Sequence, residues 1–94
     1  MHVLVAYDVA TGDKAGERRL RRVAQACKDY GQRVQKSLFE CQVGPKEWVE
    51  LRARLLAESD KAEDSLRFYF LDGDVRVEHH GANRPWDFGS GLVV

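Results

Sequence analysis

The opening segment of the chain limits its fold more than any other, because it is apolar on both faces. Residues 1–8 read Met-His-Val-Leu-Val-Ala-Tyr-Asp. Alternate side chains of an extended strand point to opposite faces, so Val3, Val5 and Tyr7 share one face. The even-numbered residues, the last of which is Asp8, share the other. A strand that is apolar on both faces needs cover on both sides, which predicts a central strand of a sheet.

Asp8 is the one acidic residue of this strand. It lies on the same face as Leu4 and Ala6, just before the turn residues Thr11-Gly12-Asp13. A carboxylate is costly to bury without a partner, so an acid at the end of a buried strand is a candidate for metal binding or catalysis. The alternative is that Asp8 only caps the next helix.

Length and composition indicate a single soluble domain with a small core. The chain has 94 residues, of which 44% are hydrophobic and 32% charged. It has no apolar run near the roughly 20 residues of a membrane helix and no signal-peptide pattern, so we expect a cytoplasmic protein without a membrane partner. Cys27 and Cys41 lack metal-ligand spacing and are expected to be buried and reduced.

Two segments have the spacing of amphipathic helices. The first has Asp13 as its N-cap and ends at Gly31, and its apolar stripe consists of Leu20, Val23, Ala24 and Cys27. The second opens at Pro45, and its buried side consists of Trp48, Leu51, Leu55 and Leu56. We interpret both stripes as core.

The remaining segments are extended or polar. Residues 33–43 alternate imperfectly and form either one bent strand or two short strands joined by a bulge. Residues 58–64 are polar and predicted to be a solvated connection. Residues 65–71 are an aromatic-rich strand, and the Asp-Gly-Asp turn at 72–74 predicts a hairpin with residues 75–79.

The histidines are not predicted to bind a metal. His79 and His80 point to opposite faces of a strand end, so they cannot grip one ion together. His2 lies at the far end of the first strand from Asp8. We interpret all three as surface residues.

Charge is distributed unevenly, although 15 basic and 15 acidic residues cancel. Between Lys14 and Lys36 there are eight basic residues and two acidic ones. Several of the basic residues occupy the start of the first helix, off its apolar stripe and close to the loop after Asp8. Such a cluster favours phosphate binding, and the candidate nucleic-acid contacts are Arg18, Arg19 and Arg22. The alternative is an ordinary solvated helix face.

The order of elements predicts an α+β fold. Residues 1–80 fit a ferredoxin-like sandwich, in which one mainly antiparallel sheet has two helices on one face. Two helices cannot cover both faces, so we expect a homodimer packed through the sheets about a two-fold axis. The apolar tail, residues 81–94, is expected to add a short strand to its own sheet or to that of the other subunit.

Four motifs then point to a family. Tyr7-Asp8-Val9 closes the first strand, and Tyr30-Gly31 closes the first helix. The segment 33–40, Arg-Val-Gln-Lys-Ser-Leu-Phe-Glu, and the segment 64–69, Asp-Ser-Leu-Arg-Phe-Tyr, follow in that order. In order and spacing the set resembles the Cas-two family of CRISPR-associated proteins, over residues 1–71.

This resemblance implies a function and partners. It implies a ferredoxin-like homodimer whose tail strand crosses to the partner's sheet. It also implies a divalent-metal-dependent endonuclease acting on RNA or DNA, with a place in spacer acquisition beside the Cas-one integrase. Asp8 matches the metal-binding aspartate of the family.

Three functions remain open at this point. A single carboxylate binds Mg²⁺ poorly, but a two-fold axis near Asp8 supplies a second one, and the metal then activates water against a phosphodiester. The competing function is a non-catalytic scaffold, in which the arginines hold DNA for the Cas-one integrase without any metal. A third class, a regulatory domain that binds a metabolite, has no matching motif.

Overall fold

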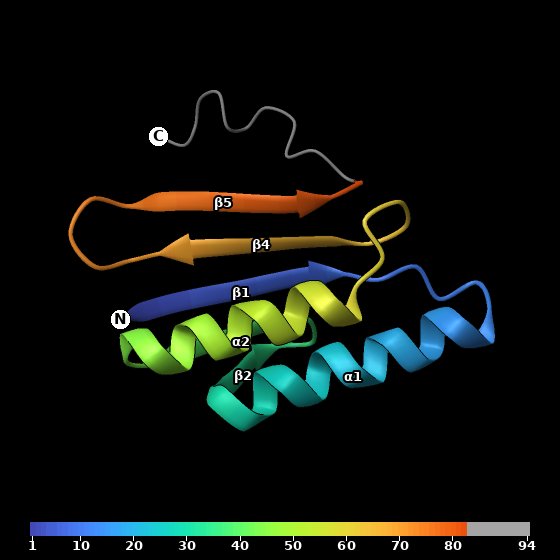
Figure 1. Ribbon diagram of the computed structural model, residues 1–94, viewed down its shortest axis with the longest axis horizontal. Coiled ribbons are helices and arrows are strands. Elements are labelled where there is room, and N and C mark those ends of the chain that lie inside the picture. The colour runs from blue at the N-terminus through green and yellow to red at the C-terminus, as the bar shows by residue number, and fades with distance from the viewer. Residues whose placement is uncertain (83–94) are drawn as a thin grey trace.

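A computed structural model describes residues 1–82 as one sheet with two helices (Figure 1). The helices are α1 (Lys14–Tyr30) and α2 (Pro45–Glu58), and the strands are β1 (His2–Asp8), β2 (Gln32–Gln35), β3 (Leu38–Gln42), β4 (Ser65–Phe70) and β5 (Arg76–Gly81). The strand order is β2-β3-β1-β4-β5, and every neighbouring pair is antiparallel. The first four strands and both helices have the ferredoxin-like order, which confirms the predicted fold class. β5 extends the sheet beside β4.

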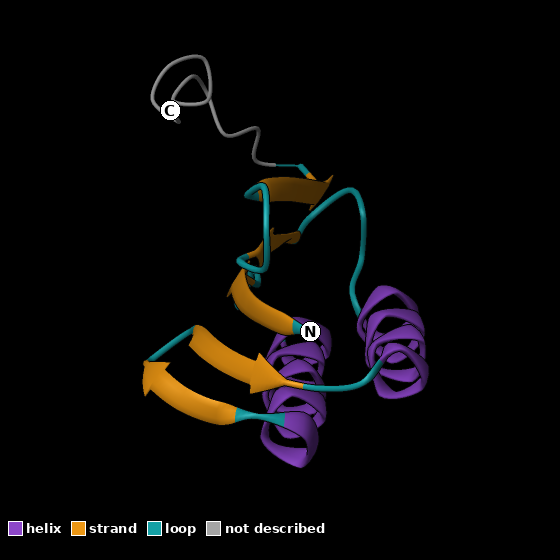
Figure 2. Cartoon of the chain, turned by 90° about the vertical axis from the view of Figure 1, so that its left-hand side faces the viewer, coloured by secondary structure: helices purple, strands orange, loops and turns teal. Residues whose placement is uncertain are grey.

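The sheet has one covered and one open face. Figure 2 shows both helices on the same side of the sheet. In β1, Val3, Val5 and Tyr7 are buried beneath the helices, while Leu4 and Ala6 are only half-buried on the opposite face. Within residues 1–82 no helix covers that opposite face, which we call the open face. β1 lies at the centre of the sheet, as its two-sided apolar pattern predicts.

The core lies between the sheet and the helices. α1 contributes Val23, Ala26 and Cys27, and α2 contributes Trp48, Leu51 and Leu55. The ring of Trp48 meets the rings of Phe68 and Phe70 edge-on, with centroids 5.0 and 5.4 Å apart. Of the two predicted stripes, Val23, Cys27, Trp48, Leu51 and Leu55 are buried in the core, while Leu20, Ala24 and Leu56 are partly buried against it.

Both cysteines are buried and unpaired, as predicted. Burial, with a smaller contribution from Cys41, raises the pKa of the Cys27 thiol to about 12. Burial likewise raises the pKa of Cys41 to about 11. Both side chains are therefore neutral and apolar at physiological pH.

The ends of α1 follow from its sequence. The side chain of Asp13 caps the helix by accepting a hydrogen bond from the Gly16 N–H at 2.8 Å. The helix ends at Gly31, whose backbone is extended rather than left-handed. A Cβ at this position would lie 2.5 Å from the Cys41 Sγ and 2.6 Å from the Glu40 carbonyl oxygen. Glycine is required here because α1 ends against β3, not because of an unusual φ.

Residues 33–43 form two strands, but the chain reverses direction between them. β2 and β3 pair as an antiparallel hairpin across the turn at Lys36 and Ser37, and the register shifts between Arg33 and Gln35. Of the two alternatives left open by the sequence, the structure shows two short strands, but the bulge lies within β2 and does not join them. All four residues of β2 are exposed, so their alternation carries no burial signal.

The hairpin at residues 72–74 is confirmed, since β4 and β5 pair directly. Gly73 has a φ of 65°, a conformation that favours glycine in a tight turn. β5 ends at Gly81, two residues beyond the predicted strand end. Most of the predicted tail, residues 83–94, lies outside the described residues. None of the helices in residues 1–82 is long and apolar enough to span a membrane.

Candidate functional site

Asp8 is exposed at the end of β1, on the open face. In the register of the sheet it lies opposite Ser65, the first residue of β4. A shallow pocket of about 150 Å³ adjoins it, and its lining includes Asp8, Ser65, Arg67 and Tyr69. The guanidinium of Arg67 donates a hydrogen bond from Nη1 to the Tyr69 hydroxyl at 2.9 Å. Asp8 is thus the acidic member of a polar corner of the open face.

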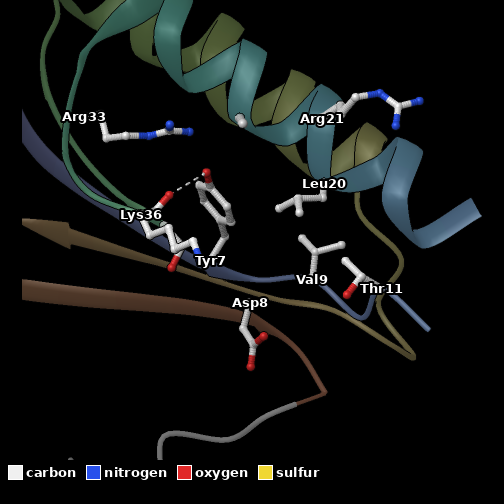
Figure 3. A pocket seen from close by; sticks show the side chains of 10 residues that line it. Tyr7, Asp8, Val9, Thr11, Leu20, Arg21, Arg33 and Lys36 are labelled. Atoms are coloured by element: carbon white, nitrogen blue, oxygen red, sulfur yellow. Dashed lines mark hydrogen bonds between the residues drawn. The ribbon is translucent and has the colours of Figure 1, made fainter. Parts of the chain in front are cut away.

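A larger, cationic pocket of about 390 Å³ lies beside the same strand end (Figure 3). Its basic residues are Arg21 of α1, Arg33 of β2 and Lys36 of the β2–β3 turn. The Tyr7 hydroxyl donates a weak hydrogen bond of 3.5 Å to the Lys36 carbonyl oxygen inside it. In Figure 3 the Arg33 side chain extends towards the Tyr7 hydroxyl, whereas the Arg21 guanidinium points away from it. A pocket lined by basic residues suits phosphate oxygens. We call this set of residues the cationic pocket.

Asp8 lies between these two pockets. It belongs to the lining of both. In Figure 3, however, its carboxylate points away from Tyr7 and Lys36. A phosphate in the cationic pocket and a cation at Asp8 would therefore lie on different sides of the end of β1.

The three arginines predicted to contact nucleic acid lie in different surroundings. Arg18 and Arg22 are exposed on α1, and Arg22 lies 3.8 Å from Glu58 of α2. The side chain of Arg19 is 19% exposed and forms an ion pair with Asp64. None of the three lines the cationic pocket, whereas their neighbour Arg21 does. The prediction of nucleic-acid contact by these arginines stays a prediction.

The excess of basic residues between Lys14 and Lys36 already indicated a cationic region. Arg21, Arg33 and Lys36 all fall within the basic segment that ends at Lys36. The sequence could not show that the hairpin folds Arg33 and Lys36 back towards α1. The pocket therefore combines basic residues that looked scattered along the chain.

Among residues 1–82 Asp64 is the buried acid, and the prediction of a solvated connection is wrong for it. Its side chain is 0% exposed. Its carboxylate accepts hydrogen bonds from the backbone N–H of Ala10 at 3.0 Å and of Asp60 at 2.9 Å. Arg19 donates to both oxygens, from Nε at 2.8 Å and from Nη2 at 3.2 Å.

These donors also control the charge of Asp64. Burial alone would raise the pKa of the Asp64 carboxyl. The hydrogen bonds from Arg19, Asp60 and Ala10 outweigh burial and hold that pKa below its usual value. Asp64 is therefore ionised at neutral pH although it is buried.

The histidines at the end of β5 are half-buried, not surface residues as predicted. The Nε2 of His80 lies 2.5 Å from the Glu78 Oε2, and its ring packs 5.8 Å from that of Phe68. No group of three or more His, Cys, Asp or Glu residues within 1–82 could hold a metal ion. At this end of β1, one chain therefore provides a single exposed carboxylate, that of Asp8, to a cation.

The fold and this geometry define a class: a small ferredoxin-like α+β domain with a carboxylate and a cationic pocket at one end of its central strand. The family model described as CRISPR associated protein Cas2 matches residues 1–78. The CRISPR-associated endoribonuclease Cas2 of Chlorobaculum tepidum is 56% identical over 96 residues, covering 100% of both chains. The chain therefore belongs to the Cas2 family, as its motifs predict.

Two further relatives agree with this assignment. The CRISPR-associated endonuclease Cas2 of Halalkalibacterium halodurans is 44% identical over 95 residues, covering 99% of each chain. The crystal structure of Streptococcus pyogenes Cas2 at pH 6.5 superposes with a TM-score of 0.70 at 56% identity. That match covers 76% of this chain and 86% of the other.

Proposed function

We propose that the protein is a metal-dependent endonuclease that hydrolyses phosphodiesters of RNA or DNA as a homodimer. The observation that carries the proposal is the exposed Asp8 on the open face, beside the cationic pocket. The names of the relatives, endoribonuclease and endonuclease, support the same reaction.

The open face supports dimerisation. It carries apolar side chains, since Leu4 lies opposite Tyr69 and Ala6 opposite Leu38 in the register of the sheet. Their partners on the other side are charged, Glu40 for Leu4 and Arg67 for Ala6. Val77 of β5 extends this patch opposite Tyr69 and is 48% exposed. A second copy that packs its own open face here would bury the patch about a two-fold axis. The same packing would bring two Asp8 carboxylates towards that axis.

A Mg²⁺ ion or another divalent cation suits such a pair of carboxylates. Mg²⁺ keeps several of its waters and binds through one or two carboxylates together with phosphate oxygens. One Asp8 from each copy would hold it. When bound, the cation supplies charge stabilisation at the phosphodiester and lowers the pKa of water. Arg21, Arg33 and Lys36 would hold neighbouring phosphates of the substrate.

We place this activity in CRISPR spacer acquisition, with the Cas-one integrase as partner and the cytoplasm as location. Membership of the family supports this role. The exposed Arg18 and Arg22 of α1 lie where a nucleic-acid backbone can reach them. Backbone contacts of this kind carry little sequence preference, which suits a protein that handles varied spacers.

A cleavage assay with Asp8→Asn tests the nuclease. We expect the variant to lose Mg²⁺-dependent cleavage of RNA or duplex DNA by about 100-fold or more, because it lacks the ligand charge. Chelation of Mg²⁺ by EDTA should stop the wild-type reaction equally. Asp74→Asn is the matched control, since Asp74 is an exposed acid in the β4–β5 turn and should have no effect. Full activity of Asp8→Asn in a clean preparation would contradict the proposal.

A non-catalytic DNA scaffold for the Cas-one integrase is the second candidate. The orientation of Asp8 away from the cationic pocket favours it, because phosphate binding there does not need the carboxylate (Figure 3). A scaffold should bind duplex DNA without metal, weaken steeply with salt and tolerate Asp8→Asn. Arg18→Glu combined with Arg22→Glu should abolish that binding. Wild-type protein that binds DNA but never cleaves with Mg²⁺ would favour the scaffold.

A further inference from the structure

We propose that Arg19 and Asp64 form a positioning pair, which fixes the loop after β1 and thereby the Asp8 carboxylate. The inference rests on the proposed function of Asp8. It also gives Arg19 a task other than contact with nucleic acid. Arg19 would act through the backbone around Asp8 and would touch neither substrate nor metal.

The carboxylate of Asp64 joins three separate segments of the chain. Its Oδ1 accepts the N–H of Ala10, in the loop after β1. Its Oδ2 accepts the N–H of Asp60, in the connection after α2. Arg19 of α1 closes the arrangement with its two-pronged ion pair. The side chain of Asp64 is fully buried among these partners.

Asp64 reaches the immediate surroundings of Asp8 in two ways, through its bond to Ala10 and through its covalent neighbour Ser65. Ala10 follows Asp8 by two residues, and Val9 between them is buried. Ser65, the neighbour of Asp64, is the register partner of Asp8 in β4. Asp8 is therefore held on its loop side and on its strand side by adjacent residues of one segment.

α1 presses on the same loop from a second direction. A Cβ added to Gly16 would lie 1.9 Å from the Ala10 carbonyl oxygen. The first turn of α1 thus contacts the Ala10 carbonyl, while Asp64 binds the Ala10 N–H. The backbone of Ala10 is therefore restrained at its N–H by Asp64 and at its carbonyl by the first turn of α1.

Stability alone does not explain a buried ion pair at this place. Apolar residues of similar volume often stabilise a core as well as a buried ion pair does, because both charges lose their hydration. A carboxylate, however, offers acceptors in fixed directions, and the Ala10 N–H uses one of them. Groups that orient a metal-binding carboxylate from behind are needed for its affinity.

The hydrogen bonds of Arg19 also distinguish its role from those of Arg18 and Arg22. Arg19 commits Nε and Nη2 to Asp64. That edge is one of the two edges of a guanidinium that can bind a phosphate with two parallel hydrogen bonds. Arg18 and Arg22 differ, since both are exposed.

The experiment compares Arg19→Gln with Glu78→Gln as a matched control. Glu78 accepts a similar two-donor ion pair from Arg52, at 3.1 and 2.6 Å, which joins β5 to α2. Three quantities are measured under conditions where each variant is folded: amide hydrogen exchange at Ala10, the Mg²⁺ concentration for half-maximal cleavage, and the salt dependence of DNA binding.

For Arg19→Gln we expect about tenfold faster exchange at Ala10 and about a tenfold higher Mg²⁺ requirement. The salt dependence of binding should not change. Arg19→Lys, which keeps the charge beside Asp64, should restore part of both losses. Glu78→Gln should alter neither quantity.

Wild-type values of exchange and Mg²⁺ requirement in Arg19→Gln, or equal changes in Glu78→Gln, would overturn the positioning pair. A fall of about one unit in the salt slope would instead make Arg19 a phosphate contact. If Arg19→Gln does not fold, Arg19→Lys takes its place and should show smaller increases in Ala10 exchange and Mg²⁺ requirement over wild type, whereas wild-type values of both would overturn the pair. Wild-type protein that never cleaves would end the proposed nuclease, whereas exchange at Ala10 still decides whether the pair holds the loop.

Discussion

At the scale of single residues, two aspartates have different roles, one exposed and one buried. Asp8 is exposed and ends the central strand, where it can meet solvent, a cation or a second subunit. Asp64 is buried and satisfied by four donated hydrogen bonds from three residues. A carboxylate is useful for binding only where it is accessible, and useful for fixing a backbone only where it is enclosed.

The buried aspartate predicts how stability depends on pH. The pKa of Asp64 is below its ordinary value of 3.8 in the folded protein, so its contribution is complete above that value. The contribution is lost as the pH falls through the folded pKa. Asp64→Asn should lower the free energy of unfolding by about 3 kcal/mol at neutral pH, because Arg19 loses its charged partner.

Chemical denaturation at several pH values checks this prediction. The difference between wild type and Asp64→Asn should shrink towards strongly acidic pH, where the wild-type carboxyl is protonated as well. A difference that stays constant down to acid pH would show that the charge of Asp64 does not matter. Asp74→Asn, at an exposed position, serves as the control.

The sequence predicted one of these aspartates and not the other, for a physical reason. Asp8 ends a strand whose other residues are mostly apolar, so its position in the strand could be predicted from the sequence pattern alone. Asp64 closes a polar stretch in which no periodicity distinguishes a buried residue from a solvated one. Its burial depends on Arg19 and Ala10, which are distant in sequence and meet it only in the folded chain.

At the scale of elements, the junction between α1 and the sheet is tightly packed. Gly31→Ala would place a methyl group against the Cys41 Sγ and the Glu40 carbonyl oxygen. We expect the free energy of unfolding to fall by about 1 to 3 kcal/mol, the usual result of overpacking. Gly12→Ala is the control, because a Cβ there meets nothing within 4 Å.

Thermal unfolding of the two variants measures this difference. Gly31→Ala should melt at a clearly lower temperature than wild type, while Gly12→Ala should stay close to it. Equal melting temperatures for Gly31→Ala and wild type would show that α1 can move away from β3 without cost.

The elements differ in how far the sequence could define them. The helices have caps and apolar stripes, so Asp13, Pro45 and the residues facing the core located them. The hairpin of β2 and β3 was ambiguous, because β2 is exposed throughout and its turn at Lys36 and Ser37 has no glycine. The cationic pocket could not be predicted for the same reason, because it forms only when that hairpin folds back towards α1.

At the scale of the whole molecule, the open face is proposed to join two copies. Leu4→Glu would replace an apolar side chain of that face by a charge beside Glu40 and should weaken the dimer by about 100-fold or more. Val49→Glu is the matched control, since Val49 is 65% exposed on α2 and away from the open face. Sedimentation equilibrium distinguishes the two. A wild-type protein that is monomeric at high concentration would contradict the proposed packing.

The central claim is that one Asp8 from each of two copies serves a single site. Wild-type and Asp8→Asn chains, unfolded and refolded together in equal amounts, test it most directly. If both carboxylates are required, Mg²⁺-dependent cleavage should fall to about one quarter of the all-wild-type value, the share of dimers with two wild-type chains under random pairing. Activity of about one half would mean that each subunit works alone, and would contradict the account.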